Sequence, residues 1–182
     1  MNIFYLNNDV RQCAQMHVDK HCIKMILESA QLLSTAHRVL DGKLFIGKTD
    51  TGRNIKRWIL PDERDKILYS ATHINHPSAI WCRQNKSNYN WLYNLLVELC
   101  KEYTYRYDKI HKCESIGLVK ALKTPPVSIP KGSFTEPTPA MPDEYKVPGN
   151  SIQSYHNYYI GAKSHMFSWK KRRPPEWINT HV

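Results

Sequence analysis

Basic and titratable side chains recur at three- and four-residue spacing between residues 17 and 35, and these residue types carry out acid–base and nucleophilic chemistry. On an ideal helix, side chains at this spacing fall within an arc of about 100°. The set, here called the basic stripe, consists of His17, Lys20, His21, Lys24, Glu28, Gln31 and Thr35. His17 shares the face only if the helix is not broken before Asp19.

The composition of the basic stripe points to a reactive amine beside a carboxylate. Neighbouring cations and desolvation lower the pKa of a lysine and free its amine to attack an electrophilic carbon, which makes Lys20 or Lys24 a candidate nucleophile. Glu28 could move a proton or stabilise a cationic sugar intermediate, and His21 could donate to a leaving group or contact a phosphate. The alternative is that the stripe is only the solvated face of an amphipathic helix.

A metal centre is a competing interpretation of part of the same region. Cys13, His17 and His21 are spaced four residues apart, and His73 and His76 could add ligands. The intervening lysines would repel a cation, and no established zinc spacing is met, so we expect neither a metal nor a cofactor. The five cysteines form no CxxC pair, which favours reduced thiols. Without a P-loop, a GxGxxG or a GxSxG motif, ATPases, Rossmann oxidoreductases and serine hydrolases are disfavoured.

The charge balance indicates a polyanionic partner. The chain carries 26 Lys and Arg against 16 Asp and Glu, a net charge of +10, and such a surface attracts nucleic acid. We expect double-stranded DNA as the partner, and the sequence does not identify a protein partner. The candidate nucleic-acid contacts are Arg53, Lys56, Arg57, His76, Lys170, Lys171, Arg172 and Arg173. Aromatic faces for stacking on bases are offered by Trp58, Tyr103, Tyr105 and Tyr107.

The elements that must position these side chains are mainly helical. Asp9 caps a helix to about residue 16, and Asp19 caps a long helix that runs to residue 40. A short β-hairpin or an irregular basic loop follows over 43–60. Further helices are predicted over 62–71, from Pro77 to residue 82, over 87–107 and over 115–122.

The remainder of the chain contains an extended segment and one more helix. Seven of the 11 prolines lie within 123–149, where apolar side chains also occur, so we expect an ordered wrap over the surface. A helix with an aromatic stripe is predicted over 151–169, followed by the basic tail. These features predict a compact, mainly α fold with one domain over 1–182, made of a helical core (1–122), the proline-rich segment (123–149) and the C-terminal part (150–182).

The location expected from the sequence is the cytoplasm, or the host cytoplasm if a phage encodes the chain. The first residues lack a basic flank and a small-residue cleavage site, which argues against a signal peptide. Since no uncharged apolar run approaches roughly 18 residues, we expect no membrane-spanning helix.

Several short motifs resemble one known family. They are MNIF at 1–4, DKHCIK at 19–24 followed by Glu28, NHPSAIW at 75–81, NY at 88–89 and EY at 102–103. Together they resemble small phage and bacterial proteins of the pyrimidine-dimer DNA glycosylase (endonuclease V) type, over roughly residues 1–110. The proline-rich segment and the aromatic C-terminal helix look like a phage-specific extension.

The resemblance implies an all-helical DNA glycosylase with abasic-site lyase activity on pyrimidines. Such enzymes use an amine that forms a Schiff base, a carboxylate, and basic residues that hold a kinked duplex. In the best-known members the amine is N-terminal and is exposed by removal of the initiator methionine. Here Asn2 is bulkier than that removal usually accepts, so Lys20 and Lys24 are the alternative nucleophiles.

Other functions remain open at this point. A weaker resemblance is to helical phage enzymes that transfer an amino acid or a polyamine onto activated thymine bases in DNA, which would need the same basic face and an extruded base. The chain could also be a non-catalytic nucleic-acid-binding or host-interaction protein, or an enzyme acting on a small anionic substrate such as a nucleotide.

Overall fold

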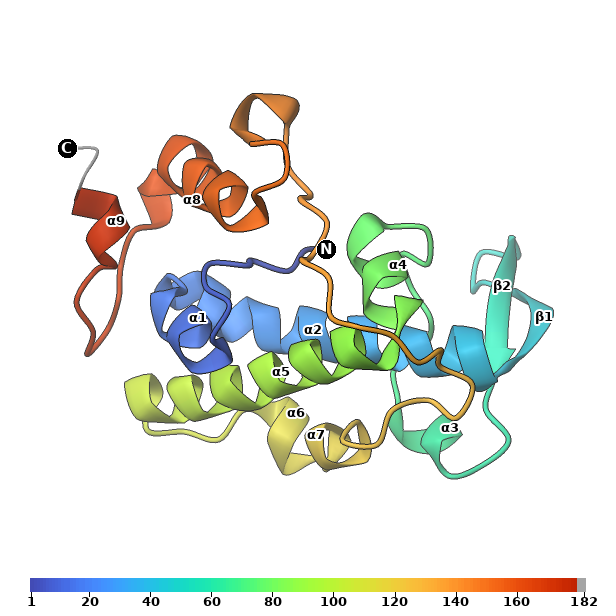
Figure 1. The fold of residues 1–182 in the computed structure, drawn as a ribbon. Helices are drawn as coiled ribbons and strands as arrows, with labels where there is room; N and C mark the ends of the chain where they lie inside the picture. The colour runs from blue at the N-terminus through green and yellow to red at the C-terminus, as the bar shows by residue number, and fades with distance from the viewer. Residues whose placement is uncertain (180–182) are drawn as a thin grey trace.

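Two long helices, α2 (Asp19–Asp41) and α5 (Lys86–Tyr107), pack side by side at the centre of the molecule. The computed structural model describes residues 1–179 (Figure 1). Ile26 and Leu33 of α2 are buried against the core, as are Leu92 and Leu96 of α5. These apolar side chains, at three- and four-residue spacing, face the core where the two helices pack, and the structure is mainly α-helical, as predicted.

The N-terminal region contains a helix break that decides the geometry of the basic stripe. Helix α1 (Val10–Met16) begins at Asp9, whose carboxylate accepts a hydrogen bond from the backbone N–H of Gln12 at 2.8 Å, as predicted. The chain leaves helical geometry at His17, and Val18 is the N-cap of α2. The prediction that Asp19 caps α2 is wrong, because its carboxylate instead accepts hydrogen bonds from Arg106.

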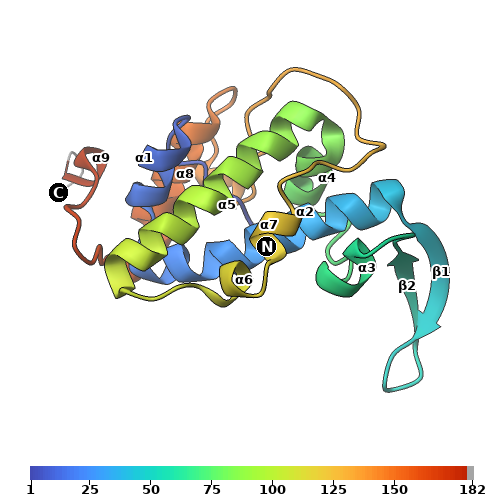
Figure 2. The same cartoon turned by 90° about the horizontal axis from the view of Figure 1, so that it is seen from below.

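The segment after α2 is a β-hairpin, which settles the alternative left open over 43–60. Strands β1 (Lys43–Lys48) and β2 (Asn54–Ile59) pair in antiparallel register, with Lys43 opposite Ile59. The hairpin projects beyond the C-terminal end of α2 (Figure 2). Its base is held by buried Arg38, which donates to the Trp58 carbonyl at 2.9 Å and to the Asp65 carboxylate at 2.6 Å.

Two short helices precede α5 in the chain, α3 (Arg64–Ile67) and α4 (Pro77–Gln84). Two more follow it before the proline-rich segment, α6 (Lys112–Ser115) and α7 (Leu118–Ala121). Helix α4 begins at Pro77, as predicted, and His76 is its N-cap. Helix α3 is much shorter than the predicted 62–71, because the backbone beyond Ile67 turns to give the Leu68 and Tyr69 carbonyls to Arg38. The predicted helix over 115–122 is also interrupted, since Gly117 adopts a left-handed conformation with φ of 83° between α6 and α7.

The proline-rich segment is an ordered wrap, as predicted, and crosses the molecule from α7 to α8 (Ser151–Ala162) (Figure 1). Its backbone is anchored to the core: the Trp81 indole donates to the Thr135 carbonyl at 3.0 Å, and the Thr135 N–H donates to Asn88 at 2.9 Å. A 3₁₀ turn, η1 (Asp143–Tyr145), is the one helical element that the structure describes within this segment.

The C-terminal part folds back over the start of the chain. Helix α8 ends seven residues before the predicted boundary at 169 and is followed by η2 (Ser164–Met166) and the single turn α9 (Glu176–Asn179). Tyr155 and Tyr159 of α8 are completely buried and pack against the ring of Phe4. Within residues 1–179, no helix has the length and apolar character needed to cross a membrane.

Candidate functional site

The structure does not place the basic stripe on one uniform face. Lys20 and Lys24 lie on the exposed side of α2, whereas His21 and Glu28 lie at the edge of the arc and are buried. They are covered by residues 1–4 on one side and by α8 on the other. His17 precedes α2 and is separated from the stripe by the helix break.

Glu28 is a nearly buried carboxylate with nitrogen atoms on both of its oxygens. Its exposed fraction is 7 %. Oε2 accepts a hydrogen bond from the backbone N–H of Asn2 at 3.0 Å and lies 3.9 Å from the α-amino group of Met1. Oε1 lies 3.4 Å from the ammonium of Lys24. The carboxylate is therefore positioned between two primary amines.

A pocket of about 250 Å³ opens above this carboxylate. Its lining includes Met1, Lys24 and Glu28, together with Tyr158 and Lys163 from the C-terminal part of the chain. The Lys163 ammonium lies 4.9 Å from the centre of the Tyr158 ring. The pocket thus combines one carboxylate, three amines and an aromatic ring, which is a set of groups suited to a phosphorylated or anionic substrate.

His76 belongs to the surroundings of the same pocket. As the N-cap of α4 it accepts a hydrogen bond from the Ser78 N–H through Nδ1 at 3.1 Å. Burial lowers its pKa, the Met1 ammonium and His73 lower the pKa further, and Glu28 acts in the opposite direction. The sequence names His76 as a candidate nucleic-acid contact and a candidate metal ligand; the structure places it at the start of α4, outside the lining of the pocket.

His21 supports the pocket from below as a neutral side chain. Its ring stacks on Phe4 with centroids 4.2 Å apart, and its Nδ1 lies 2.8 Å from the Tyr159 hydroxyl. Burial lowers the pKa of His21 to about 3, and the neighbouring His17, Lys163 and Lys24 contribute to the decrease. A neutral, hydrogen-bonded ring orients its neighbours and is unsuited to holding a phosphate by charge.

His17 is enclosed in the core beneath α1. Its Nδ1 donates to the Cys13 carbonyl at 2.7 Å, and Nε2 is buried without a hydrogen-bond partner among the described residues. Burial lowers its pKa to about 4. On the other half of α2, His37 is a core histidine with both ring nitrogens hydrogen-bonded: Nε2 donates to the Tyr89 hydroxyl at 2.8 Å and Nδ1 accepts from Arg64 at 3.0 Å.

These buried histidines predict that the protein loses stability in mild acid. Burial lowers the pKa of His17 to about 4, of His21 to about 3 and of His37 to about 4, against an unfolded value of about 6.5. Between pH 6.5 and 4 the unfolded chain binds more protons, so the free energy of unfolding should fall by up to about 1.4 kcal/mol per pH unit for each histidine. Denaturant titrations at pH 7.5, 6 and 5 measure this decrease. The control variant His165→Gln, at an exposed position, should show the same pH dependence as the wild-type protein. A free energy of unfolding that does not change between pH 7.5 and 5 in the wild-type protein would contradict the prediction.

The basic tail is largely engaged with other parts of the protein. Lys171 donates to the Asp108 carboxylate at 2.9 Å, and Arg172 contacts both oxygens of Glu102 at 3.0 Å. Burial by itself would raise the pKa of Glu102, but hydrogen bonds from Arg172 and Arg106 hold the pKa below its usual value. Lys170 and Arg173 are exposed. Of the four tail residues predicted to contact DNA, two therefore already have carboxylate partners.

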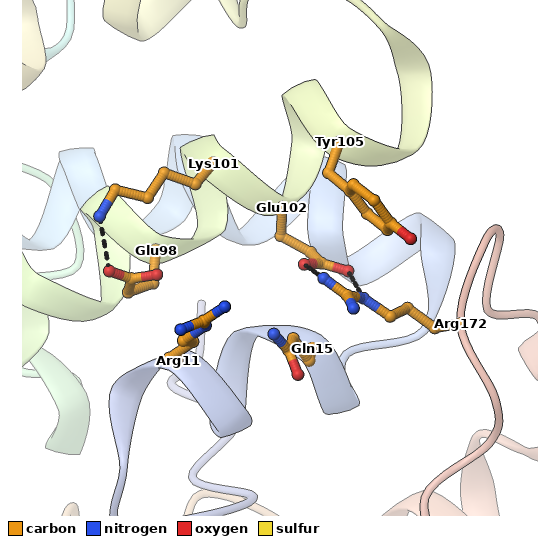
Figure 3. Close-up of a pocket in the computed structure, with 7 residues that line it drawn as sticks. All are labelled: Arg11, Gln15, Glu98, Lys101, Glu102, Tyr105 and Arg172. Carbon is orange, nitrogen blue, oxygen red and sulfur yellow. Dashed lines mark hydrogen bonds and ion pairs between the residues drawn. The ribbon is translucent and has the colours of Figure 1, made fainter.

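Arg172 also lines a second cavity, of about 370 Å³, between α1 and α5 (Figure 3). Figure 3 shows Glu98 and Lys101 paired on one side of it and Glu102 and Arg172 paired on the other. Because these charged side chains neutralise each other, the cavity has the character of a structural ion network.

The predicted DNA contacts in the hairpin lie far from the tail. Arg53 and Lys56 are exposed and Arg57 is half-buried. The hairpin and the C-terminal segments lie at opposite ends of the molecule, with the start of the chain between them (Figure 1). One rigid patch that joins both basic segments is therefore absent from the described structure.

The pocket includes groups that the sequence reasoning missed. Tyr158, Lys163 and Ala140 reach it from segments more than 110 residues beyond Glu28. No spacing rule within α2 points to them. The clustering of tyrosines between residues 155 and 159 was the one available signal, because it indicated a helix that must pack against something aromatic.

No three His, Cys, Asp or Glu side chains among residues 1–179 are grouped so that they could hold a metal ion. Cys13 donates its thiol to the Phe4 carbonyl, and the other four cysteines are buried and unpaired as disulfides. No protein-family model matches the chain, and no curated protein and no solved structure is significantly similar to it.

Proposed function

We propose that this protein is a DNA base-processing enzyme of the glycosylase and abasic-site lyase kind, acting on pyrimidine nucleotides through the pocket above Glu28. The observation that carries the proposal is a carboxylate of 7 % exposure within 4 Å of two primary amines in a pocket. Schiff-base chemistry at a sugar carbon needs an amine nucleophile and a carboxylate that accepts its proton. The net charge of +10 supports duplex DNA as the substrate.

In the proposed reaction the amine nitrogen attacks C1′ of an extruded nucleotide and forms a C–N bond. The bond between C1′ and the base breaks, and the base leaves with the electron pair and takes up a proton. Glu28 accepts the proton that the amine loses and stabilises the positive charge on the sugar. Opening of the sugar ring gives the protonated imine, from which elimination cleaves the 3′ phosphate ester and water releases the enzyme.

Two amines are candidates for the nucleophile. Lys24 is on an exposed turn of α2, with 67 % of its side chain accessible, and lies 3.4 Å from Glu28. The Met1 side chain is 4 % exposed, and the Met1 α-amino group lies 3.9 Å from the same carboxylate. Removal of Met1 would leave an amine on Asn2, whose nitrogen is 3.0 Å from Oε2. The N-terminal position is the more enclosed of the two, since the Met1 side chain is 4 % exposed against 67 % for Lys24, and this supports the N-terminal amine over Lys24. Lys20 does not line the pocket.

Borohydride trapping tests the proposal and identifies the amine. Wild-type protein incubated with an abasic duplex and borohydride should give a covalent adduct, because the reagent reduces the imine to a stable amine. Lys24→Arg should retain the adduct, whereas two residues added before Met1 should abolish it. The matched control is Lys20→Arg, on the same exposed side of α2. Absence of an adduct with wild-type protein, together with intact duplex binding, would establish a non-catalytic DNA-binding protein instead.

A further inference from the structure

The β1–β2 hairpin exposes more apolar surface than its structural role requires. Leu44, Phe45 and Ile46 are 47 %, 42 % and 59 % exposed, and Ile59 is 50 % exposed. Neither strand pairs with any other strand of the described chain, so both edges are open. A two-stranded hairpin is only marginally stable by itself in water, and open edges favour unwanted association. The exposed ribbon is therefore expected to have a partner.

The charge of the hairpin identifies the chemistry of that partner. Residues 43–59 contain five basic side chains and one acidic side chain, a net charge of +4. In the part of the chain that the structure describes, none of the five basic groups forms an ion pair. This contrasts with Lys171 and Arg172 of the tail, whose charges are neutralised within the protein. The hairpin thus presents uncompensated positive charge to an external polyanion.

One face of the hairpin combines this charge with polar and apolar groups. Side chains alternate between the two faces along a strand, and the register places every second residue of β1 opposite every second residue of β2. The outer face consists of Leu44, Ile46, Lys48, Asn54, Lys56 and Trp58, of which all but Trp58 are exposed. Lys48 donates to the Asn54 side-chain oxygen at 2.5 Å, so the two polar groups lie together on this face.

We propose that the β1–β2 hairpin is a ribbon that enters the major groove of duplex DNA with its outer face toward the base edges. This proposal rests on the proposed function for its substrate. The major groove, about 12 Å wide, admits a two-stranded ribbon. Lys48 and Asn54 supply the donors and acceptors that read purine edges, and Leu44 and Ile46 supply apolar contacts for thymine methyl groups. Arg53 and Lys56 contact the phosphates.

The geometry of α2 sets the distance between the groove contact and the reaction site. Glu28 and the last residue of α2, Asp41, are thirteen residues apart on one continuous helix, which is about 20 Å.

Salt-dependent binding to an unmodified duplex of twenty base pairs tests the ribbon. The double variant Arg53→Gln/Lys56→Gln should reduce the slope of log K against log salt by about two units, since each lost phosphate contact removes about 0.9. The control variant Lys120→Gln/Lys123→Gln removes two charges from exposed positions outside the hairpin and should leave the slope unchanged. Equal slopes for the two double variants would overturn the proposal.

A second variant separates groove insertion from simple phosphate contact. Leu44→Ser/Ile46→Ser should weaken duplex binding about tenfold at every salt concentration without changing the slope, because it removes contacts to bases. Wild-type affinity of this variant for the duplex would overturn the proposal. The proposal would also be overturned if the variant bound DNA normally but lost a self-association that the wild-type protein shows in sedimentation. That result would assign the surface to a second copy of the chain. Borohydride trapping tests the reaction site independently of the hairpin. If the adduct forms but the hairpin variants bind DNA like the wild type, the proposed function is retained and the groove contact is rejected. If the hairpin variants weaken binding but no adduct forms, the groove contact is retained and the proposed function is rejected.

Discussion

Replacement of Glu28 by glutamine is expected to slow formation of the borohydride-trapped adduct by about 10²- to 10⁴-fold, the usual contribution of a positioned acid–base group. The amide cannot accept the proton that the attacking amine must lose. Its oxygen can still accept the N–H of Asn2, which lies 3.0 Å from the present carboxylate, so the local structure should persist. Single-turnover trapping on an abasic duplex gives the rate, and thermal unfolding verifies that the fold is unchanged.

Glu98→Gln is the matched control for this variant. Glu98 is also a helical glutamate paired with a lysine, since its carboxylate lies 2.8 Å from Lys101, but it borders the other cavity. The control should form the adduct at the wild-type rate. Equal rates for Glu28→Gln and wild type would show that the carboxylate takes no part in the chemistry, and the proposed mechanism would have to be abandoned.

Replacement of Arg106 by methionine is expected to cost about 3–5 kcal/mol of stability, which is the penalty for leaving the partners of a buried charge unpaired. The guanidinium is completely buried. It donates to the carboxylates of Glu102 and Asp19 at 2.8 and 2.9 Å and to the carbonyls of Gln15 and His17 at 2.9 and 2.8 Å. A protein of this size should then melt roughly 10 °C lower in a calorimetric scan.

Arg172→Met removes the outer cation from the same carboxylate and provides the comparison. The Arg172 side chain is 29 % exposed, and Glu102 would keep its hydrogen bond from Arg106. The expected loss is about 1 kcal/mol or less, in the range of partly exposed ion pairs. Equal losses for the two variants would mean that the inner arginine does not hold the junction between α1 and α2.

Local patterns in the sequence were sufficient for most of the architecture. The helix predicted over 87–107 is present as α5, Asp9 caps α1, Pro77 begins α4, and the proline-rich segment is ordered. Each of these features depends on a helix cap, on the spacing of apolar residues or on the restriction of the backbone by proline, and all of these act within a few residues. The helix predicted over 62–71 ends early, after Ile67, because the Leu68 and Tyr69 carbonyls accept hydrogen bonds from the distant Arg38.

The candidate site was less accessible to such patterns. The helical spacing places Glu28 and Lys24 within one arc of α2, but it does not reveal which of these side chains other segments of the protein bury. Residues 1–4 and α8 bury Glu28 and leave Lys24 exposed. The difference between a carboxylate in a pocket and a charged stripe in water is therefore decided by tertiary packing.

The order of synthesis has a consequence for when the pocket can exist. Asn2 donates its side-chain amide to the Ala140 carbonyl and accepts from the Tyr155 hydroxyl, both at 2.8 Å. The contacts of Asn2 therefore cannot form until residues 140 and 155 have been synthesised. A nascent chain that ended near residue 122 would contain the whole of α2 and the hairpin but would lack Ala140 and Tyr155, so the pocket above Glu28 would still be incomplete.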